Sequence, residues 1–194
     1  MPELSSEMWT HRYDNGQTGW DLGQPSNPLK AYIDTLKNKA LRILIPGGGN
    51  GYEAECLAAT GFKNAVLLDW SQPPLDAFAA RNPNFPHNQL ICEDFFQHQA
   101  TYDLIIEQTF FCAIDPSLRG AYAQKMHELL EPGGKLVGVL FNTTFAKEGP
   151  PFGGSDDEYR TYFEPYFHFH HFEACYNSIP PRAGNELWVE LERR

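Results

Sequence analysis

Short apolar runs recur along the first 141 residues and alternate with segments that favour helices. The expected strands cover residues 41–45, 65–68, 88–92, 102–107 and 135–141. The expected helices cover residues 29–37, 52–60, 75–81 (capped by Ser71) and 118–130, the last closed by a turn at 131–134. Strands that alternate with helices predict an α/β fold with a doubly wound, mostly parallel sheet and helices on both faces.

The pattern changes after residue 141. A stretch rich in glycine, proline and acid at 147–158 precedes a short expected helix at 159–164. Two strand-like runs at 166–176 and 186–192 then predict a C-terminal antiparallel hairpin at the sheet edge, which brings the sheet to seven strands. We expect one domain spanning 1–194.

The first forty residues differ in kind, because they carry Trp9, Tyr13 and Trp20 before the first expected strand. Such an aromatic segment can form a lid over the carboxyl edge of the sheet. It can equally be a helical extension that packs its aromatic rings onto the core. Both interpretations of residues 1–40 stay open at this point.

Composition narrows the class of protein. The 194 residues are 42% hydrophobic and carry a formal net charge of −10, which disfavours nucleic acid and anionic membranes as partners. The chain has no apolar run of membrane-spanning length and no basic start followed by an apolar segment. Its four cysteines are widely scattered, which is typical of reduced thiols. We expect a cytoplasmic protein and favour a monomer.

A glycine-rich turn follows the first expected strand. Gly47, Gly49 and Gly51 form G-x-G-x-G, which lets the backbone turn sharply and approach a ligand. Tyr52 breaks the dinucleotide spacing G-x-G-x-x-G, and the turn lacks the Gly-Lys-Ser/Thr ending of a triphosphate loop. Alone, the loop could simply be a tight turn.

Two acidic positions complete the pattern. Asp69 stands 20 residues after Gly49, where α/β nucleotide sites place a carboxylate that accepts ribose hydroxyls. Asp94 follows the third expected strand and could accept from an adenine amino group while Phe95 packs on the ring. Each acid alone could merely cap a helix or turn, but together with the glycines they favour a ribose-bearing cofactor.

These residues resemble class I S-adenosylmethionine-dependent methyltransferases and, more narrowly, the thiopurine S-methyltransferase family, especially its thiol, thiocyanate and halide branch. The matching segments are 9–25, 46–52, 93–96, 109–114, 116–122 and 149–152. The resemblance implies a Rossmann-like fold and transfer of a methyl group from S-adenosylmethionine to a small soft nucleophile, leaving S-adenosylhomocysteine. The candidate cofactor-binding residues are Trp9, Tyr13, Trp20, Gly47, Gly49, Gly51, Asp69, Asp94, Phe95 and Gln108.

Arg119 and Glu107 are the candidate residues for positioning the substrate. Arg119 matches the family's arginine, and it could attract an anionic acceptor or simply pair with a helix acid. The family often has aspartate at the position of Glu107 and an aromatic residue at that of Gln108, so these two departures bear on the choice of acceptor. No metal is expected, since His168 and His170 lie on one face of their strand with few acidic or thiol companions.

Methyl transfer from a sulfonium is an in-line displacement, so a soft anion needs little help from an acid or base. Aromatic side chains could hold the sulfonium by cation–π attraction. One alternative is transfer to nitrogen or oxygen, with Glu107 or His11 as the base. A second is a cofactor-binding protein without turnover on the same fold. Cys112 as a nucleophile is disfavoured against a buried thiol.

Overall fold

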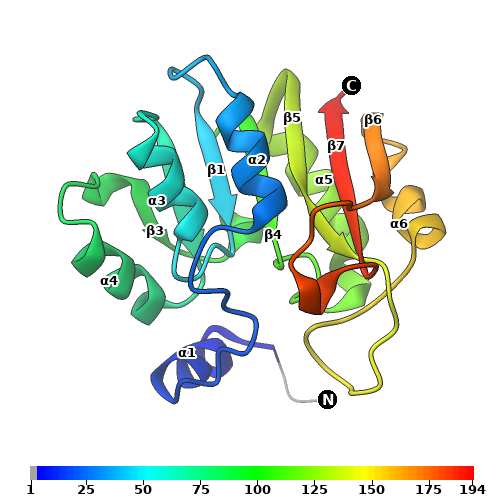
Figure 1. The fold of residues 1–194 in the computed structure, drawn as a ribbon, viewed down its shortest axis with the longest axis horizontal. Helices are drawn as coiled ribbons and strands as arrows, with labels where there is room; N and C mark the ends of the chain where they lie inside the picture. Colours follow the sequence, from blue (N-terminus) through cyan, green and yellow to red (C-terminus); the bar gives the residue numbers. More distant parts are fainter. Residues whose placement is uncertain (1–3) are drawn as a thin grey trace.

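A computed structural model describes residues 4–194. One sheet contains seven strands in the order β3-β2-β1-β4-β5-β7-β6 (Figure 1). The strands are β1 (Ile43–Pro46), β2 (Ala65–Asp69), β3 (Leu90–Cys92), β4 (Tyr102–Gln108), β5 (Leu130–Phe141), β6 (Phe167–Ala174) and β7 (Glu186–Arg193). The first five pair in parallel, and β7 is antiparallel to both of its neighbours. The predicted doubly wound sheet with a C-terminal antiparallel hairpin is therefore confirmed.

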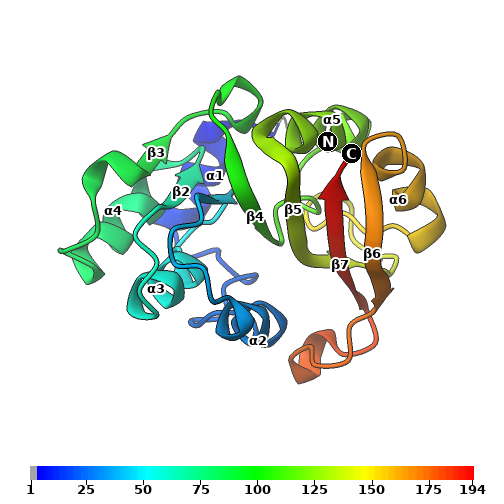
Figure 2. The same ribbon diagram turned by 90° about the horizontal axis from the view of Figure 1, so that it is seen from above.

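Helices cover both faces of this sheet. They are α1 (Ser6–Asp14), α2 (Asn27–Thr35), α3 (Tyr52–Ala59), α4 (Gln72–Arg81), α5 (Arg119–Leu129) and α6 (Asp156–Phe163). Short 3₁₀ turns occur at η1 (His87–Gln89), η2 (Phe95–Gln97), η3 (Pro116–Leu118) and η4 (Pro180–Arg182). Figure 2 shows α2 and α3 on one side of the sheet and α5 and α6 on the other. None of the helices in residues 4–194 has the length and apolar character to cross a membrane.

The period-2 alternation of strand side chains divides the interior into two cores. In β1, Ile43 and Ile45 join the cluster under α2, α3 and α4, while Leu44 joins the cluster under α5 and α6. In β4, Leu104 and Ile105 divide in the same way. The central strands are thus buried on both faces, which explains why they read as nearly continuous apolar runs.

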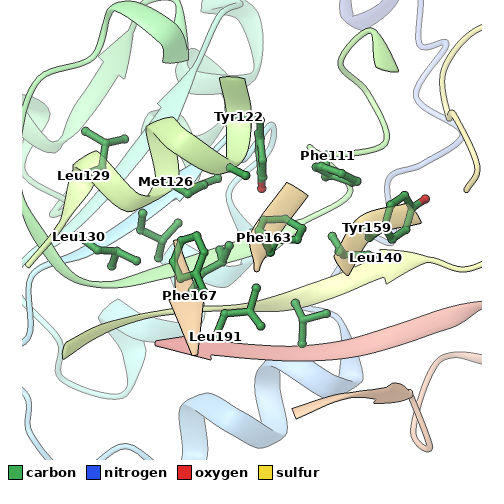
Figure 3. Packing of buried hydrophobic residues seen from close by; sticks show 14 of the residues in the cluster. Phe111, Tyr122, Met126, Leu129, Leu130, Leu140, Tyr159, Phe163, Phe167 and Leu191 are labelled. Carbon is green, nitrogen blue, oxygen red and sulfur yellow. The ribbon is translucent and has the colours of Figure 1, made fainter. Parts of the chain in front are cut away.

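In the core under α5 and α6, several aromatic rings pack among leucine and methionine side chains (Figure 3). Phe111 lies 5.0 Å from both Tyr122 and Tyr159, measured between ring centroids, and both pairs are edge-on. Phe163 is fully buried and continues the cluster toward Phe167 at 6.0 Å. Edge-on ring pairs add about 0.5 to 1.5 kcal/mol each beyond the area they bury. This cluster therefore holds the chain that follows β4 firmly against the sheet.

The expected turn at residues 131–134 is wrong. The strand β5 begins at Leu130, directly after α5, and Leu130 already pairs with Tyr102 of β4. The register then shifts before Leu104 pairs with Lys135, so the intervening residues form an irregularity inside the strand. Proline and glycines favour a turn locally, but the pairing with β4 keeps these residues in the sheet.

The strand order changes direction between β1 and β4, since the chain leaves β1 toward β2 on one side and returns to β4 on the other. Ligands of open α/β sheets bind beyond the carboxyl ends of the strands at such a switch point. The helix α1 and the segment between β5 and α6 both lie beyond this end of the sheet, at the bottom of Figure 1.

We predict that Phe163→Ala lowers the free energy of unfolding by about 3 to 5 kcal/mol, because it opens a cavity in the aromatic core. Urea denaturation followed by circular dichroism measures this loss. The matched control is Tyr176→Ala, an aromatic residue that is 91% exposed, which should change stability by less than about 0.5 kcal/mol. Equal effects of the two substitutions would contradict the packing described.

Candidate active site

The glycine loop after β1 has a backbone that other residues rarely adopt. Gly47, Gly49 and Gly51 have φ of 56°, 52° and 71°, in the left-handed region. A Cβ on Gly47 would lie 2.3 Å from the Phe110 ring, and one on Gly49 would lie 2.6 Å from the Tyr13 hydroxyl oxygen. Both the conformation and the space therefore require glycine. Gly51 caps α3 and packs against the core instead of reaching the cavity described below.

Asp69 ties this loop to the end of β2. Its carboxylate accepts the Gly49 N–H at 2.8 Å and the Ser71 N–H at 2.9 Å. Burial raises the pKa of Asp69 to about 6, although these backbone hydrogen bonds work in the opposite direction. A carboxylate has about four acceptor positions, so two backbone donors leave capacity for a diol.

The segment after β3 places the next acid beside an aromatic wall. Asp94 accepts the Phe96 N–H at 2.9 Å and thereby caps η2. Phe95 is buried, and its ring lies 5.1 Å from Phe110 and 5.6 Å from Tyr122. The adenine-binding role expected of Asp94 and Phe95 is thus compatible with a fixed ring platform.

A cavity of about 1070 Å³ opens between these loops at the carboxyl ends of β1, β2 and β4. Its wall includes nine of the ten predicted cofactor residues, namely Trp9, Tyr13, Trp20, Gly47, Gly49, Asp69, Asp94, Phe95 and Gln108. Gly51, Glu107, Arg119 and His11 do not line it. The structure therefore brings the candidate cofactor residues together and leaves both candidate positioning residues outside the wall.

Aromatic side chains of the N-terminal segment close one side of this cavity. The Trp20 ring lies edge-on to Trp9 at 5.5 Å and to Tyr13 at 5.7 Å. The helix α1 has no buried residue, so these rings line the cavity instead of joining either core cluster. Burial and the nearby Asp69 raise the pKa of the Tyr13 hydroxyl, which stays protonated.

Glu107 lies behind the cavity wall and stabilises the turn that follows β4. It is buried and accepts hydrogen bonds from the Phe110 and Phe111 N–H groups and from the Tyr122 hydroxyl. Burial raises its pKa to about 7. These bonds hold the turn in which Thr109 has a φ of 58°, a strained conformation for a β-branched residue that costs about 1 to 3 kcal/mol.

Arg119 is also buried, with 2% of its surface exposed. It donates to Glu158 at 2.6 Å and to the Gly153 carbonyl at 2.8 Å, and its guanidinium lies between the rings of Phe111 and Tyr159. Of the two interpretations left open, the structure contains the pairing with a helix acid. Any effect of Arg119 on substrate would act through the segment it holds.

Two further cavity residues were assigned no role from the sequence. Arg182 donates to the Trp20 carbonyl at 2.9 Å, which joins the end of η4 to the N-terminal segment. The two residues are 162 positions apart, so no local pattern could have paired them. Arg12 lies inside the resembling segment 9–25 and also lines the cavity.

Cys112 lines the cavity as a neutral thiol. Its Sγ lies 3.1 Å from the Thr109 carbonyl, and burial raises the pKa of the thiol far above its ordinary value. A nucleophilic cysteine needs a lowered pKa, so this environment disfavours that role. On β6, His170 pairs with Glu192, and within residues 4–194 no group of three His, Cys, Asp or Glu side chains could hold a metal ion.

The site fits a ribonucleoside sulfonium cofactor on its own geometry. The Gln108 side-chain oxygen is buried in the cavity wall and has no hydrogen-bond partner among the described residues. A buried acceptor without a partner is costly, so a donor group on a ligand fits there. The glycine cradle, the Asp69 carboxylate and the aromatic side chains complete a surface suited to an adenosyl group bearing a positive sulfur.

Solved structures share this architecture. The chain superimposes on the 1,6-didemethyltoxoflavin-N1-methyltransferase of Burkholderia thailandensis with a TM-score of 0.74 and 15% identity, covering all of this chain and 92% of that chain. A TehB-like methyltransferase of Corynebacterium glutamicum gives a TM-score of 0.67 and 16% identity, covering 97% and 98% of the two chains. The fold is that of the class I, Rossmann-like methyltransferases.

Sequence relatives then define the family. The model of the family "Thiopurine S-methyltransferase (TPMT)" matches residues 4–190. A probable thiol methyltransferase 2 of Arabidopsis thaliana is 34% identical, over 96% of this chain and 84% of that protein. The thiocyanate methyltransferase 1 of Brassica oleracea is 31% identical, over 96% and 85%. The chain belongs to the thiopurine S-methyltransferase family and is an S-adenosylmethionine-dependent methyltransferase.

We predict that Glu107→Gln changes the pH dependence of stability. Folding raises the pKa of Glu107 from an ordinary 4.5 to about 7. Its stabilising contribution is therefore present in full below pH 4.5 and is lost as pH rises through 7. Between pH 4.5 and 8, the wild type should therefore lose up to about 3 kcal/mol more free energy of unfolding than the variant does. Urea denaturation at a series of pH values measures this difference. If the free energies of unfolding of the two proteins changed with pH in parallel, Glu107 would not be a buried carboxyl with a raised pKa.

Proposed function

We propose that this methyltransferase acts on a small soft nucleophile, a thiolate or a similar sulfur or halide anion. One observation carries the proposal, namely that within residues 4–194 both candidate general bases lie outside the wall of the cavity. Methyl transfer to nitrogen or oxygen would need a general base, and the two candidates for it are Glu107 and His11. Neither of these residues lines the cavity. A soft anion needs no such base.

The carboxylates that do line the cavity already accept hydrogen bonds from the chain. Asp69 and Asp94 accept from backbone N–H groups, as described above. Asp21 accepts from the Gly23 N–H, Glu53 from the Ser26 N–H and Asp115 from the Ser117 N–H. Each of these carboxylates thus stabilises a loop or turn of the cavity wall.

Bound S-adenosylmethionine supplies an electrophilic methyl group on a positively charged sulfur. We assign the ribose diol to Asp69, the adenine to Asp94 and Phe95, and a donor group of the cofactor to the Gln108 oxygen. Trp9, Trp20 and Tyr13 would attract the sulfonium through their ring faces and exclude water from the attacking anion. Held in this way, the cofactor would supply its methyl group to a lone pair of the nucleophile, and the electrons of the broken carbon–sulfur bond would stay on a neutral thioether.

We further propose that residues 4–25 act as a lid over the bound cofactor. The Tyr13 hydroxyl lies against Gly49, the Trp20 ring is edge-on to Tyr13 at 5.7 Å, and Arg182 donates to the Trp20 carbonyl. Cofactor entry would require this segment to open, because its aromatic residues form one wall of the cavity. The free thiols of the described cysteines fit a cytoplasmic enzyme.

We predict that Asp69→Ala weakens binding of S-adenosylhomocysteine about tenfold or more, because two charge-assisted hydrogen bonds to the diol are lost. Isothermal titration calorimetry measures the dissociation constant. Asp76→Ala, an exposed acid on α4, is the control and should leave it unchanged. In the wild type, affinity should fall as pH drops below about 6, where Asp69 becomes protonated. Unchanged affinity in Asp69→Ala would remove the ribose assignment.

Methyl transfer from labelled S-adenosylmethionine tests the acceptor class. We predict methylated products with thiols, thiocyanate and iodide, and rates with matched amines and alcohols lower by a factor of about 100 or more, a difference of roughly 3 kcal/mol in transition-state stabilisation. Glu107→Gln should keep the ratio between these acceptor classes. Faster transfer to nitrogen or oxygen, abolished by Glu107→Gln, would instead support the alternative with a general base. Cofactor binding without any product would support a protein without turnover.

A further inference from the structure

The Arg12 guanidinium lies in the cavity wall and has no counter-ion among residues 4–194. The Arg12 guanidinium carbon lies 5.1 Å from the Trp9 ring centroid and 5.9 Å from that of Trp20. In the described chain, every other arginine donates to a carboxylate or a carbonyl: Arg42, Arg81, Arg119, Arg160, Arg182, Arg193 and Arg194. Arg12 makes cation–π contacts and, within residues 4–194, no ion pair or side-chain hydrogen bond.

Among the described residues, the carboxylates of the cavity accept hydrogen bonds from other donors, and none of them forms an ion pair with Arg12. Asp21, for example, belongs to the same N-terminal segment as Arg12 but accepts from the Gly23 N–H at 2.7 Å. A guanidinium presents five N–H donors and stays charged at all accessible pH. It is weakly hydrated, so it loses little hydration free energy when it stacks on aromatic rings. It is therefore suited to receive an anion that comes from solution.

We propose that Arg12, stacked on Trp9 and Trp20, is the binding site for the negative charge of the methyl acceptor. This inference rests on the proposed function and names the acceptor class more closely, as a small anion such as thiocyanate or a halide. The anion would lie between two positive charges, the guanidinium and the cofactor sulfonium. Coulombic attraction inside a water-poor cavity would then hold the nucleophile near the methyl group.

Charge balance gives this arrangement a second consequence. Transfer of a methyl cation equivalent to thiocyanate or iodide consumes the sulfonium charge and the negative charge of the acceptor together. Both products, the methylated acceptor and the thioether of S-adenosylhomocysteine, carry no charge at the reacting atoms. The methylated product therefore loses its attraction to Arg12, which favours its release.

The test compares Arg12→Gln and Arg12→Lys with the wild type. Arg160→Gln is the matched control, since Arg160 also lies over two rings, those of Phe169 and Phe172, but outside the cavity. Calorimetry gives the dissociation constant of thiocyanate for protein saturated with S-adenosylhomocysteine, and separately that of S-adenosylhomocysteine. Steady-state assays give KM and kcat for thiocyanate, and circular dichroism shows that each variant is folded.

We expect Arg12→Gln to weaken thiocyanate binding and to raise its KM about tenfold or more, with kcat and the S-adenosylhomocysteine affinity changed less than about twofold. The thiocyanate affinity of Arg12→Lys should lie between those of the wild type and Arg12→Gln, because lysine keeps the charge and loses the planar set of donors. Arg160→Gln should match the wild type.

Two results would overturn the proposal. If Arg12→Gln weakens S-adenosylhomocysteine and leaves thiocyanate unaffected, Arg12 binds the carboxylate of the cofactor. If neither constant changes, Arg12 has no role in binding either ligand. Thiocyanate binding is measured without turnover, so the anion site can stand even where the wild type methylates no sulfur or halide acceptor, an outcome that would refute the proposed function alone.

Discussion

The hydrogen bond from the Gly49 N–H to the Asp69 carboxylate joins the two parallel strands on which the site depends. A second bond, from the Gly48 N–H to the Leu68 carbonyl at 3.1 Å, runs beside it. Together they hold the glycine loop against the end of β2 in a left-handed backbone that leaves no space for a Cβ at Gly49. The Tyr13 hydroxyl fills that space from the N-terminal segment. Loop, strand and the proposed lid therefore meet at one point.

Buried polar groups around the glycine loop have distinct structural roles. The Glu107 carboxylate, placed behind the wall, fixes the strained turn at Thr109 and so the position of Phe110, whose ring packs over Gly47. Arg119 fixes the segment before α6 through Glu158 and Gly153. The charged groups most deeply buried near the site thus support its wall. The groups proposed to contact ligands are the aromatic rings, the carboxylates of Asp69 and Asp94, the Gln108 amide oxygen and the Arg12 guanidinium, all of which line the cavity.

The fold was largely predictable, because each central strand reads as an apolar run between glycine or acidic stops. The place of Asp69 and Asp94 in the cavity wall was predictable for the same reason, since each stands at or just beyond the end of such a run. The start of β5 was not, because pairing with Tyr102 overrides the turn preference of Pro132 and the glycines that follow it. The contacts of Arg119 and Arg182 could not be predicted from the sequence either, since their partners lie 39 and 162 residues away along the chain. Patterns of local spacing identify which residues end a strand, but they do not say which way a buried side chain turns.

A crystal structure of the protein with S-adenosylhomocysteine bound would test the ribose assignment on which the proposed site depends. We expect the ribose diol within hydrogen-bond distance of the Asp69 carboxylate, the adenine against Phe95 and the thioether sulfur beside the rings of Trp9, Tyr13 and Trp20. Electron density for the nucleoside away from the glycine loop, or a ribose without contact to Asp69, would contradict it.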